Sequence, residues 1–575
     1  MKRVCCFVFI ITLAILNISC SRNQTPSSDN EFDYSSQISE IAINSDNINT
    51  LKEVGLIWGF LKYHHPAIAE GAYNWDYELF RIIPKVIDKN SRKEKDKIFS
   101  EWIDLLGKFK TEKTDNQPDD KIKIKPDLDW INQSGFSKEL VKKLNDIRRA
   151  KRKDSHHYIQ FVPGVKNPQF TNEKAYENAI ISDMGYRLLS LFRYWNSIQY
   201  YFPYKNLIEQ DWKDVLEEFI PQFIKANDET KYALTTLALI AHIHDTHATV
   251  MNNYEVEKYK GGFYAAPRIR FIENKAVVTG FYNEGYGKHT GLQIGDILTE
   301  ISGKTIETII EERLPFTPAS NYPTQLRNIA QDLLRTNAQS IDVEYIRNNL
   351  HNKVTLTTYK SNEINAHFLS TSDTSFKLLQ NDIAYLFPGS LKRGEIHELW
   401  NKVKDTKGLI IDLRCYPSDF IVFSLGEKLM PEATPFARFT HGSVKIPGLF
   451  TFTESLSVGK KNPDYYKGKI VILINETTQS QAEYTTMAFR AAPNTTVVGS
   501  TTAGADGNVS TIVLPGGINS WISGIGVYYP DKTETQQIGI VPDIQLLPTI
   551  QGIIEGRDEL LEKALEIIWK VNGKT

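Results

Sequence analysis

Ser480 stands where a serine side chain could act as a nucleophile. The apolar run 469–474 predicts a buried β-strand, a polar turn follows it, and a helical pattern begins with Gln481. The first N–H groups of a helix have no partner within it, so the N–H of Gln481 could stabilise an oxyanion beside Ser480. These positions would suit acyl transfer through a covalent intermediate.

The same residues also form a capping pattern that needs no chemistry. In the sequence Ser-Gln-Ala-Glu, 480–483, the serine would cap the helix and the glutamate would return a hydrogen bond. Taken alone, Ser480 is better explained as a helix cap. A second strand pattern ends in the turn Tyr-Pro-Ser-Asp at 416–419, which could add another oxyanion N–H and favours the nucleophile.

A candidate general base lies in the turn Asp245-Thr246-His247, which follows a long apolar helical pattern. The surrounding sequence His-Ile-His-Asp-Thr-His also raises the hypothesis of a zinc site. His242 and His244 are two residues apart and do not share a helix face, and no third ligand run is evident. Zinc is therefore the weaker hypothesis, and His242 and His244 are expected to pack within the helical region.

Alternating strand and helix patterns surround Ser480 and predict an α/β domain over residues 363–575. Such series form largely parallel sheets covered by helices, and their sites lie at the carboxyl ends of strands. Ser480 follows one of these ends. The strand patterns lie at 382–389, 407–417, 468–474 and 495–504.

Residues 258–362 change to short strand patterns separated by turns. The run Gly-Leu-x-x-Gly-Asp-x-Leu at 291–298, followed by Ser302-Gly303, resembles a PDZ domain. PDZ domains bind an extended peptide by adding it to a sheet edge. A PDZ-shaped spacer that binds nothing is the alternative.

Two helical segments in the N-terminal half resemble each other without gaps. The matching residues are 137 positions apart, and each copy predicts a helix, a proline-containing turn and a second helix. We interpret them as a duplicated helical module over 47–114 and 179–257, joined by the connecting segment 115–178; coincidence between two aromatic hairpins is the alternative. The matches pair Trp58 with Trp195, Tyr63 with Tyr200, Pro66 with Pro203 and Trp75 with Trp212.

The chain begins with a pattern typical of export. Two basic residues precede an apolar run, and Ser19 precedes Cys20, so residues 1–19 predict a signal peptide. The position of Cys20 resembles a bacterial lipoprotein signal, which implies a lipidated cysteine, although Asn17 replaces the usual leucine. An ordinary signal peptide is the alternative. We expect an exported, lipid-anchored protein of the cell envelope, with 20–46 as a flexible tether.

Composition limits the remaining classes of function. A net charge of −2 gives no global field that would favour nucleic acid. Cys5 and Cys6 lie in the expected signal peptide, so with Cys20 lipidated only Cys415 is left and no intramolecular disulfide is expected. The oligomeric state does not follow from the sequence.

Seven motifs in order give the chain a specific resemblance. It resembles the carboxy-terminal-processing and tricorn-type serine peptidases from His247 to about Leu565. That resemblance implies a crotonase-like, ClpP-type α/β core, Ser480 as nucleophile, the Gln481 amide as an oxyanion donor, polypeptide substrates and no metal or organic cofactor. The motifs are the Asp-x-His turn, the PDZ-like insert, LIIDLR, TQSQAEY, VVGSTTAGADGN, GIVPDI and GRDELLEKALEII.

The two branches of this family differ in the base. The processing branch has a lysine 25 residues after the serine, where this chain has Ala505. The tricorn-like branch has a histidine before the PDZ insert, which His247 matches, with Thr246 in place of a serine. That branch also has a glutamate shortly before Gly-x-x-Pro-Asp; the strict position is Gln536, and Glu534 would fit only after a register shift.

The turn expected to complete the oxyanion hole also departs from the family. Many members have glycines there, and this chain has Pro417-Ser418-Asp419. Ser418 and Asp419 keep backbone N–H groups, but an inward Asp419 carboxylate would oppose an oxyanion. These departures motivate an alternative function, a peptide-binding protein that keeps the peptidase fold without activity.

Overall fold

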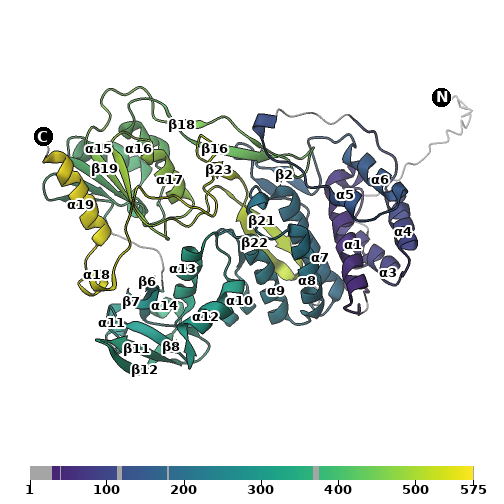
Figure 1. Cartoon of the computed structure of the whole chain (residues 1–575), viewed down its shortest axis with the longest axis horizontal. Helices are drawn as coiled ribbons and strands as arrows, with labels where there is room; N and C mark the ends of the chain where they lie inside the picture. The colour runs from purple at the N-terminus through teal and green to yellow at the C-terminus, as the bar shows by residue number, and fades with distance from the viewer. Residues whose placement is uncertain (1–28, 39, 113–118, 178–180, 367–373, 574–575) are drawn as a thin grey trace, which may run out of the picture.

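The structure is a computed structural model that describes residues 29–573, except 39, 113–118, 178–180 and 367–373. The expected signal peptide and Cys20 lie outside the described residues. The molecule is elongated, with the helices of the N-terminal half at one end and the α/β part at the other (Figure 1). Across the described ranges, no helix combines the length and apolarity needed to cross a bilayer.

A mostly parallel sheet forms the centre of the C-terminal part. Strands β14, β15, β19, β20 and β24 pair in parallel, and β13 adds an antiparallel edge. Every residue of β15 is buried, as expected for a strand covered on both faces. Helix α19 (Glu559–Asn572) packs on one face, and α17 (Gln481–Arg490) covers the other. The strands are β13 (Phe376–Leu379), β14 (Ile383–Leu386), β15 (Gly408–Asp412), β19 (Lys469–Ile474), β20 (Thr495–Gly499) and β24 (Ile544–Gln545).

The two helical segments repeat one contact in detail. The indole Nε1 of Trp58 donates to the carbonyl oxygen of Trp75 at 2.9 Å, and Trp75 returns the bond at 3.0 Å. Trp195 and Trp212 exchange the same two bonds at 2.6 and 3.0 Å. Equal spacing in the sequence thus produces equal geometry. The helices are α1 (Ser45–His64) and α3 (Trp75–Ile87) in one copy, α7 (Met184–Tyr201) and α8 (Trp212–Lys225) in the other.

Buried ion pairs join the copies to the connecting segment. Arg193 of α7 lies 2.6 Å from Asp76 of α3 and 2.9 Å from Glu173 of the connecting segment. Lys62 of α1 pairs with the same glutamate at 2.6 Å. Removing one partner would leave an uncompensated buried charge, which typically costs 3–5 kcal/mol. These ion pairs therefore tie the two copies and the connecting segment together.

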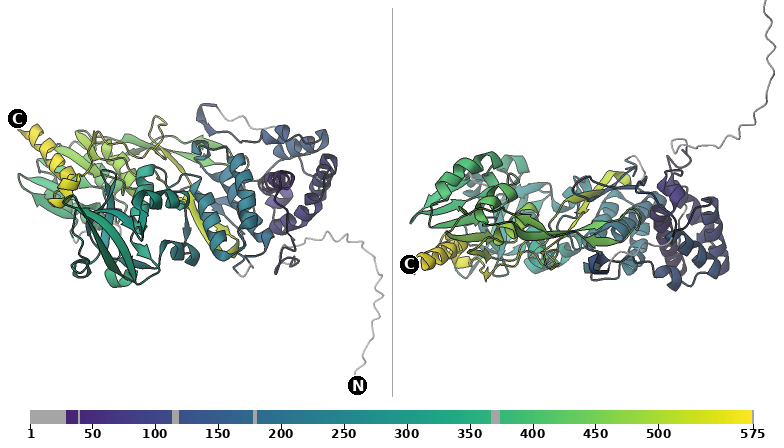
Figure 2. Two further views of the ribbon diagram at one scale, coloured as in Figure 1. Left: turned by 60° about the horizontal axis from the view of Figure 1, so that its bottom comes forward. Right: turned by 90° about the horizontal axis from the view of Figure 1, so that it is seen from above.

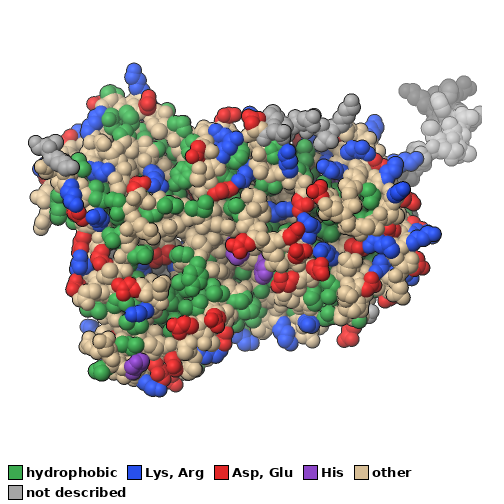
Figure 3. Space-filling model, in the orientation of Figure 1, with side chains coloured by type: hydrophobic (Ala, Val, Ile, Leu, Met, Phe, Trp, Pro, Cys, Tyr) green, Lys and Arg blue, Asp and Glu red, His purple; other side chains and the backbone are tan. Residues whose placement is uncertain are grey.

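The middle segment forms its own sheet and packs beside the α/β part (Figure 2). Strand β6 (Pro267–Ile272) ends the sheet and pairs only with β7 (Lys275–Phe281) among the described strands. Helix α13 (Tyr322–Asp332) lies along β6. On the face drawn in Figure 3, acidic and basic side chains are interspersed over all parts of the molecule.

Candidate active site

Ser480 ends the turn after β19 and precedes α17. Its backbone lies at φ +56° and ψ −119°. Sparsely populated conformations of this kind cost on the order of 1–3 kcal/mol and cluster at functional sites. Among the described residues, the Ser480 side chain makes no capping hydrogen bond of its own to α17, and it lines a cavity instead. The geometry thus argues against a simple helix cap.

Glu483 holds the nucleophile turn in place. Its Oε2 accepts the N–H of Ser480 at 3.0 Å and that of Ala505 at 3.1 Å. Its Oε1 accepts the N–H of Gly504 at 2.8 Å and the hydroxyl of Thr502. Burial raises the pKa of Glu483, and these hydrogen bonds partly offset the rise. The expected capping glutamate therefore also fastens the start of α17 to the 502–505 loop.

A pairing between distant strands delivers His247. The helix α9 (Glu229–Ala241) leads into the turn that carries this residue, and β4 (Thr249–Met251) follows. Strand β4 pairs antiparallel with β22 (Ile518–Ser523), so a strand of the N-terminal half completes a sheet of the C-terminal half. As a result His247 lies beside Ser523.

Ser523 bridges His247 and Asp245. The Nδ1 of His247 lies 2.8 Å from the Ser523 Oγ, which lies 2.9 Å from the Asp245 Oδ1. The N–H of Ser523 donates to the other carboxylate oxygen at 2.6 Å. A carboxylate can only accept, so the Ser523 hydroxyl hydrogen points to Asp245 and its lone pair accepts the Nδ1–H of His247. This network assigns the proton to Nδ1 and leaves a lone pair on Nε2, as a general base requires.

Burial lowers the pKa of His247 below its ordinary value of 6.5, and the charge of Asp245 partly offsets this change. The imidazole is therefore neutral at neutral pH. A neutral imidazole with a free Nε2 can accept a proton from a hydroxyl.

Thr246 contacts the neighbouring loops rather than the imidazole. Its Oγ1 donates to the carbonyl oxygen of Ala503 at 2.8 Å and accepts the N–H of Ser320 at 2.9 Å. The N–H of Thr246 donates to the Ser320 Oγ at 2.9 Å. The threonine expected beside the base thus fixes the His247 turn against the loop that Glu483 also holds.

Gln536 and Glu534 have different surroundings. The Nε2 of Gln536 donates to the Asp245 Oδ1 at 3.2 Å, within the network behind His247. Glu534 forms an ion pair with Lys123 of the connecting segment. Gln536 rather than Glu534 thus lies in the network behind His247, and Lys123 engages Glu534. Asp245 supplies the carboxylate.

Among the described residues, some backbone N–H groups near Ser480 have hydrogen-bond partners and others do not. The N–H of Gln481 is engaged by no described residue, as expected for the first residue of a helix. The N–H of Ser418 donates to the carbonyl oxygen of Pro388 at 3.0 Å and is therefore already engaged in this structure. The N–H of Asp419 has no partner within the described ranges and is the remaining candidate of this turn.

The Asp419 carboxylate is engaged by backbone donors. It accepts the N–H of Arg393 at 3.0 Å and that of Phe420 at 2.7 Å, and these bonds lower the pKa of Asp419. The side chain of Gln481 donates to the Asp419 carbonyl oxygen at 2.7 Å and ties this turn to α17. The negative charge of Asp419, which could oppose an oxyanion, is thereby bound by the backbone N–H groups of Arg393 and Phe420.

Ser480, Gln481 and His247 line one cavity of about 790 Å³. Most of its other lining is aromatic or aliphatic, which suits the side chains of a bound polypeptide. The connecting segment forms part of the wall. Other lining residues include Val165, Phe420, Phe439, Tyr484, Asp506, Trp521 and Val527.

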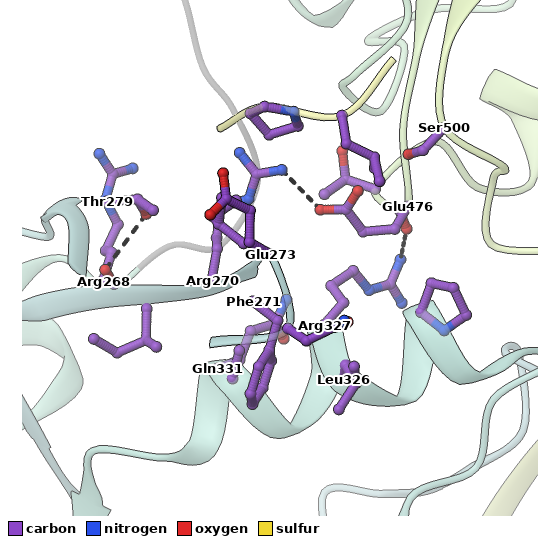
Figure 4. A pocket seen from close by; sticks show the side chains of 18 of the residues that line it. Arg268, Arg270, Phe271, Glu273, Thr279, Leu326, Arg327, Gln331, Glu476 and Ser500 are labelled. Atoms are coloured by element: carbon purple, nitrogen blue, oxygen red, sulfur yellow. Dashed lines mark hydrogen bonds and ion pairs between the residues drawn. The ribbon is translucent and has the colours of Figure 1, made fainter. Parts of the chain in front are cut away.

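A second cavity of about 400 Å³ lies between β6, α13 and the turn that leads to Ser480 (Figure 4). Arg270 of β6 pairs with Glu476 of this turn at 2.8 Å. Arg327 of α13 donates to the carbonyl oxygen of Glu476 at 2.8 Å and to the Gln479 Oε1 at 3.1 Å. Both walls of this cavity therefore hold the segment that precedes the nucleophile.

The histidine-rich turn is the part of the chain that raised the zinc hypothesis. Within the described part of the chain, no three His, Cys, Asp or Glu side chains are grouped so that they could hold a metal ion. The Nδ1 of His242 bonds to the carbonyl oxygen of Ala238 at 2.9 Å, and its ring packs on Phe219. His242 thus packs within the helical region, as the sequence predicts.

The model of peptidase family S41 matches residues 435–546, which include Ser480 and the 502–505 loop. This segment therefore resembles peptidase family S41. The chain is a serine-type peptidase, and the matched segment contains strands β19, β20 and β24 of the mostly parallel sheet. No curated protein is a significant match to the chain.

Solved structures that resemble this peptidase include mature CPAF complexed with lactacystin, with a TM-score of 0.52 and 12% identity, covering 68% of this chain and 98% of that one. Mature CPAF without a named ligand has a TM-score of 0.51 and 12% identity, covering 66% and 96%. A photosystem II D1 C-terminal processing protease has a TM-score of 0.38 and 14% identity, covering 64% and 96%. At these identities the two CPAF likenesses support the fold alone.

Sequence patterns did not assign roles to Asp245 and Ser523 in this site. The Asp245 Oδ1 accepts the backbone N–H of His247 at 3.0 Å, a bond that an aspartate two residues before a histidine can form. Ser523 lies in a strand with no catalytic motif, and only the pairing of β22 with β4 places it.

Proposed function

We propose that this peptidase hydrolyses peptide bonds by an acyl-enzyme mechanism with Ser480 as nucleophile and His247 as general base. The observation that carries the proposal is the buried series Asp245, Ser523 and His247, which engages Nδ1 of a histidine that lines the same cavity as Ser480. The core is assigned to the crotonase-like, ClpP-type class, and the substrate is a polypeptide.

In the first step, His247 takes the proton of the Ser480 hydroxyl as the oxygen attacks a peptide carbonyl carbon. The N–H groups of Gln481 and Asp419 stabilise the developing oxyanion. Asp245, acting through Ser523, stabilises the imidazolium, which then gives its proton to the leaving amine. Water attacks the acyl-enzyme with His247 again as base, and the Ser480 hydroxyl is restored.

Labelling with a fluorophosphonate probe tests this mechanism. The folded chain is expected to form a covalent adduct on Ser480 that peptide mapping locates, and His247→Ala is expected to slow labelling strongly. The alternative, a peptide-binding protein without activity, predicts no adduct and no cleavage while peptide binding persists. Labelling of another serine with Ser480 unmodified would contradict the proposed nucleophile.

Residues 258–362 are assigned as a PDZ-like domain that presents extended polypeptide along the edge strand β6 and α13. Leu326 and Phe271 line the cavity between these elements. The variant Leu326→Glu is expected to reduce cleavage of long unfolded chains several-fold and to leave hexapeptides nearly unchanged. Equal loss on both substrates would favour a spacer that binds nothing.

The targeting pattern supports anchoring of the exported chain to a membrane through a lipidated Cys20. Cys20→Ala is expected to release soluble protein or to leave unprocessed precursor, as measured by membrane fractionation and mass spectrometry. Cys415 is present in both forms, so its labelling after denaturation serves as the internal control for thiols. Unchanged fractionation with a processed N-terminus would favour an ordinary signal peptide.

A further inference from the structure

A buried carboxyl group that takes no part in the proposed mechanism lines the cavity that Ser480 also lines. Asp506 follows the loop that Glu483 holds, and the residue before it, Ala505, accepts the N–H of Ser480 at 3.0 Å. The Asp506 side chain therefore lies close to the nucleophile turn. It is 3% exposed and belongs to the cavity lining.

Only one of the two oxygens of this carboxyl group has a hydrogen-bond partner among the described residues. One oxygen, Oδ1, accepts the N–H of Gly507 at 2.6 Å. The other, Oδ2, is buried and has no hydrogen-bond partner among the described residues. An unpaired buried carboxylate is costly, so such a group needs either a proton or a positive partner.

The described lining of the cavity offers Asp506 no permanent cation, and burial lowers the pKa of its two histidines, His247 and His441. No lysine or arginine is among the described residues that line the cavity. Burial and the nearby charge of Glu483 raise the pKa of Asp506 well above its usual range. In the free chain this carboxyl group therefore lacks a positive partner among the described residues that line the cavity.

We propose that Asp506 receives the basic side chain of a substrate lysine or arginine next to the cleaved bond, and so determines the specificity of the peptidase. The ammonium or guanidinium group would supply the partner that Oδ2 lacks. The long apolar stem of such a side chain suits the walls formed by Phe439, Tyr484 and Val527. This inference rests on the proposed function of Ser480 and His247.

The test compares peptides that carry lysine, norleucine or glutamine in turn at each of the four positions around the cleaved bond. Wild-type chain is expected to prefer lysine over norleucine at one position by on the order of 100-fold in kcat/KM, as for a buried charge pair. Asp506→Asn keeps the shape and the acceptor for Gly507. It is expected to lower kcat/KM for the lysine peptide far more than for the norleucine peptide, and so to abolish that preference. Asp531→Asn, at an exposed carboxylate, is the matched control and is expected to change neither.

Three results would overturn the inference: no position that favours lysine, equal loss on all peptides in Asp506→Asn, or a preference for glutamine. A binding arm separates this inference from the mechanism. Calorimetry on Ser480→Ala is expected to show tighter binding of the lysine peptide than of the norleucine peptide, and Ser480→Ala combined with Asp506→Asn is expected to lose the difference. If Ser480→Ala still cleaves peptides, the proposed function fails, and the binding comparison still decides the role of Asp506.

Discussion

The imidazole of His247 and the carboxylate of Asp245 are joined through a hydroxyl group rather than by a direct hydrogen bond. The Nδ1 of His247 lies 4.0 Å from the nearest carboxylate oxygen of Asp245, and the Ser523 Oγ lies between them at 2.8 and 2.9 Å. The carboxylate therefore orients the imidazole only as long as Ser523 is present. The role of Ser523 can therefore be tested separately from that of His247.

Ser523→Ala is expected to reduce kcat/KM by about 10- to 100-fold, because the Nδ1–H of His247 loses its acceptor and the imidazole loses its fixed tautomer. Asp245→Asn should cost more, on the order of 10³ to 10⁴, since the imidazolium also loses its countercharge. Steady-state kinetics measure both effects. Ser520→Ala is the control, because Ser520 is also buried on β22 but does not contact His247. Normal activity of Ser523→Ala would contradict the bridging role.

The pH dependence should report a histidine whose pKa is lowered. Activity requires neutral His247. The value of kcat/KM is therefore highest above the pKa of His247 in the free enzyme, and it falls as the pH drops through that pKa. Because burial lowers that pKa, the midpoint is expected below the ordinary value of 6.5, with a plateau at neutral pH. Asp245→Asn should move it lower still, since the aspartate charge raises the pKa. A midpoint above about 8 would instead indicate a lysine-like base.

The elements around Ser480 were predictable because their signals are local. The strand 469–474 matches β19 residue for residue, and the helix begins at Gln481 as the capping pattern predicts. His247 could be chosen because the lysine of the other branch is replaced by Ala505. Ser523 could not be chosen from the sequence, because it is 278 residues from Asp245 and the face of the sheet to which its side chain points depends on strand register. For the same reason the sequence could not decide between Glu534 and Gln536.

Ser480→Ala is expected to remove activity and leave the fold nearly unchanged. The Ser480 side chain makes no capping bond of its own to α17 among the described contacts, so the melting temperature should change by only a few degrees. Glu483→Ala should lower stability by about 3 kcal/mol or more, because four donors then lose their acceptor. Thermal melting followed by circular dichroism compares them, with the exposed Glu432→Ala as control. Equal destabilisation by Ser480→Ala would restore the capping role.

The last prediction concerns the two arginines that reach the nucleophile turn from the middle segment. Arg327→Ala removes the hydrogen bonds to Glu476 and Gln479, and Arg270→Ala removes the ion pair with Glu476 (Figure 4). Since small displacements of catalytic groups can cost up to about 10²-fold, each variant is expected to lower kcat with little change in KM, even for short peptides.

Arg268→Ala is the matched control for this experiment. Arg268 lies on the same strand and lines the same cavity, but none of the described bonds to the turn come from it. Its removal should leave kcat unchanged. Wild-type kcat in both Arg270→Ala and Arg327→Ala would mean that the turn keeps Ser480 in place without the middle segment. A change in KM alone would mean that the arginines bind substrate rather than position the nucleophile.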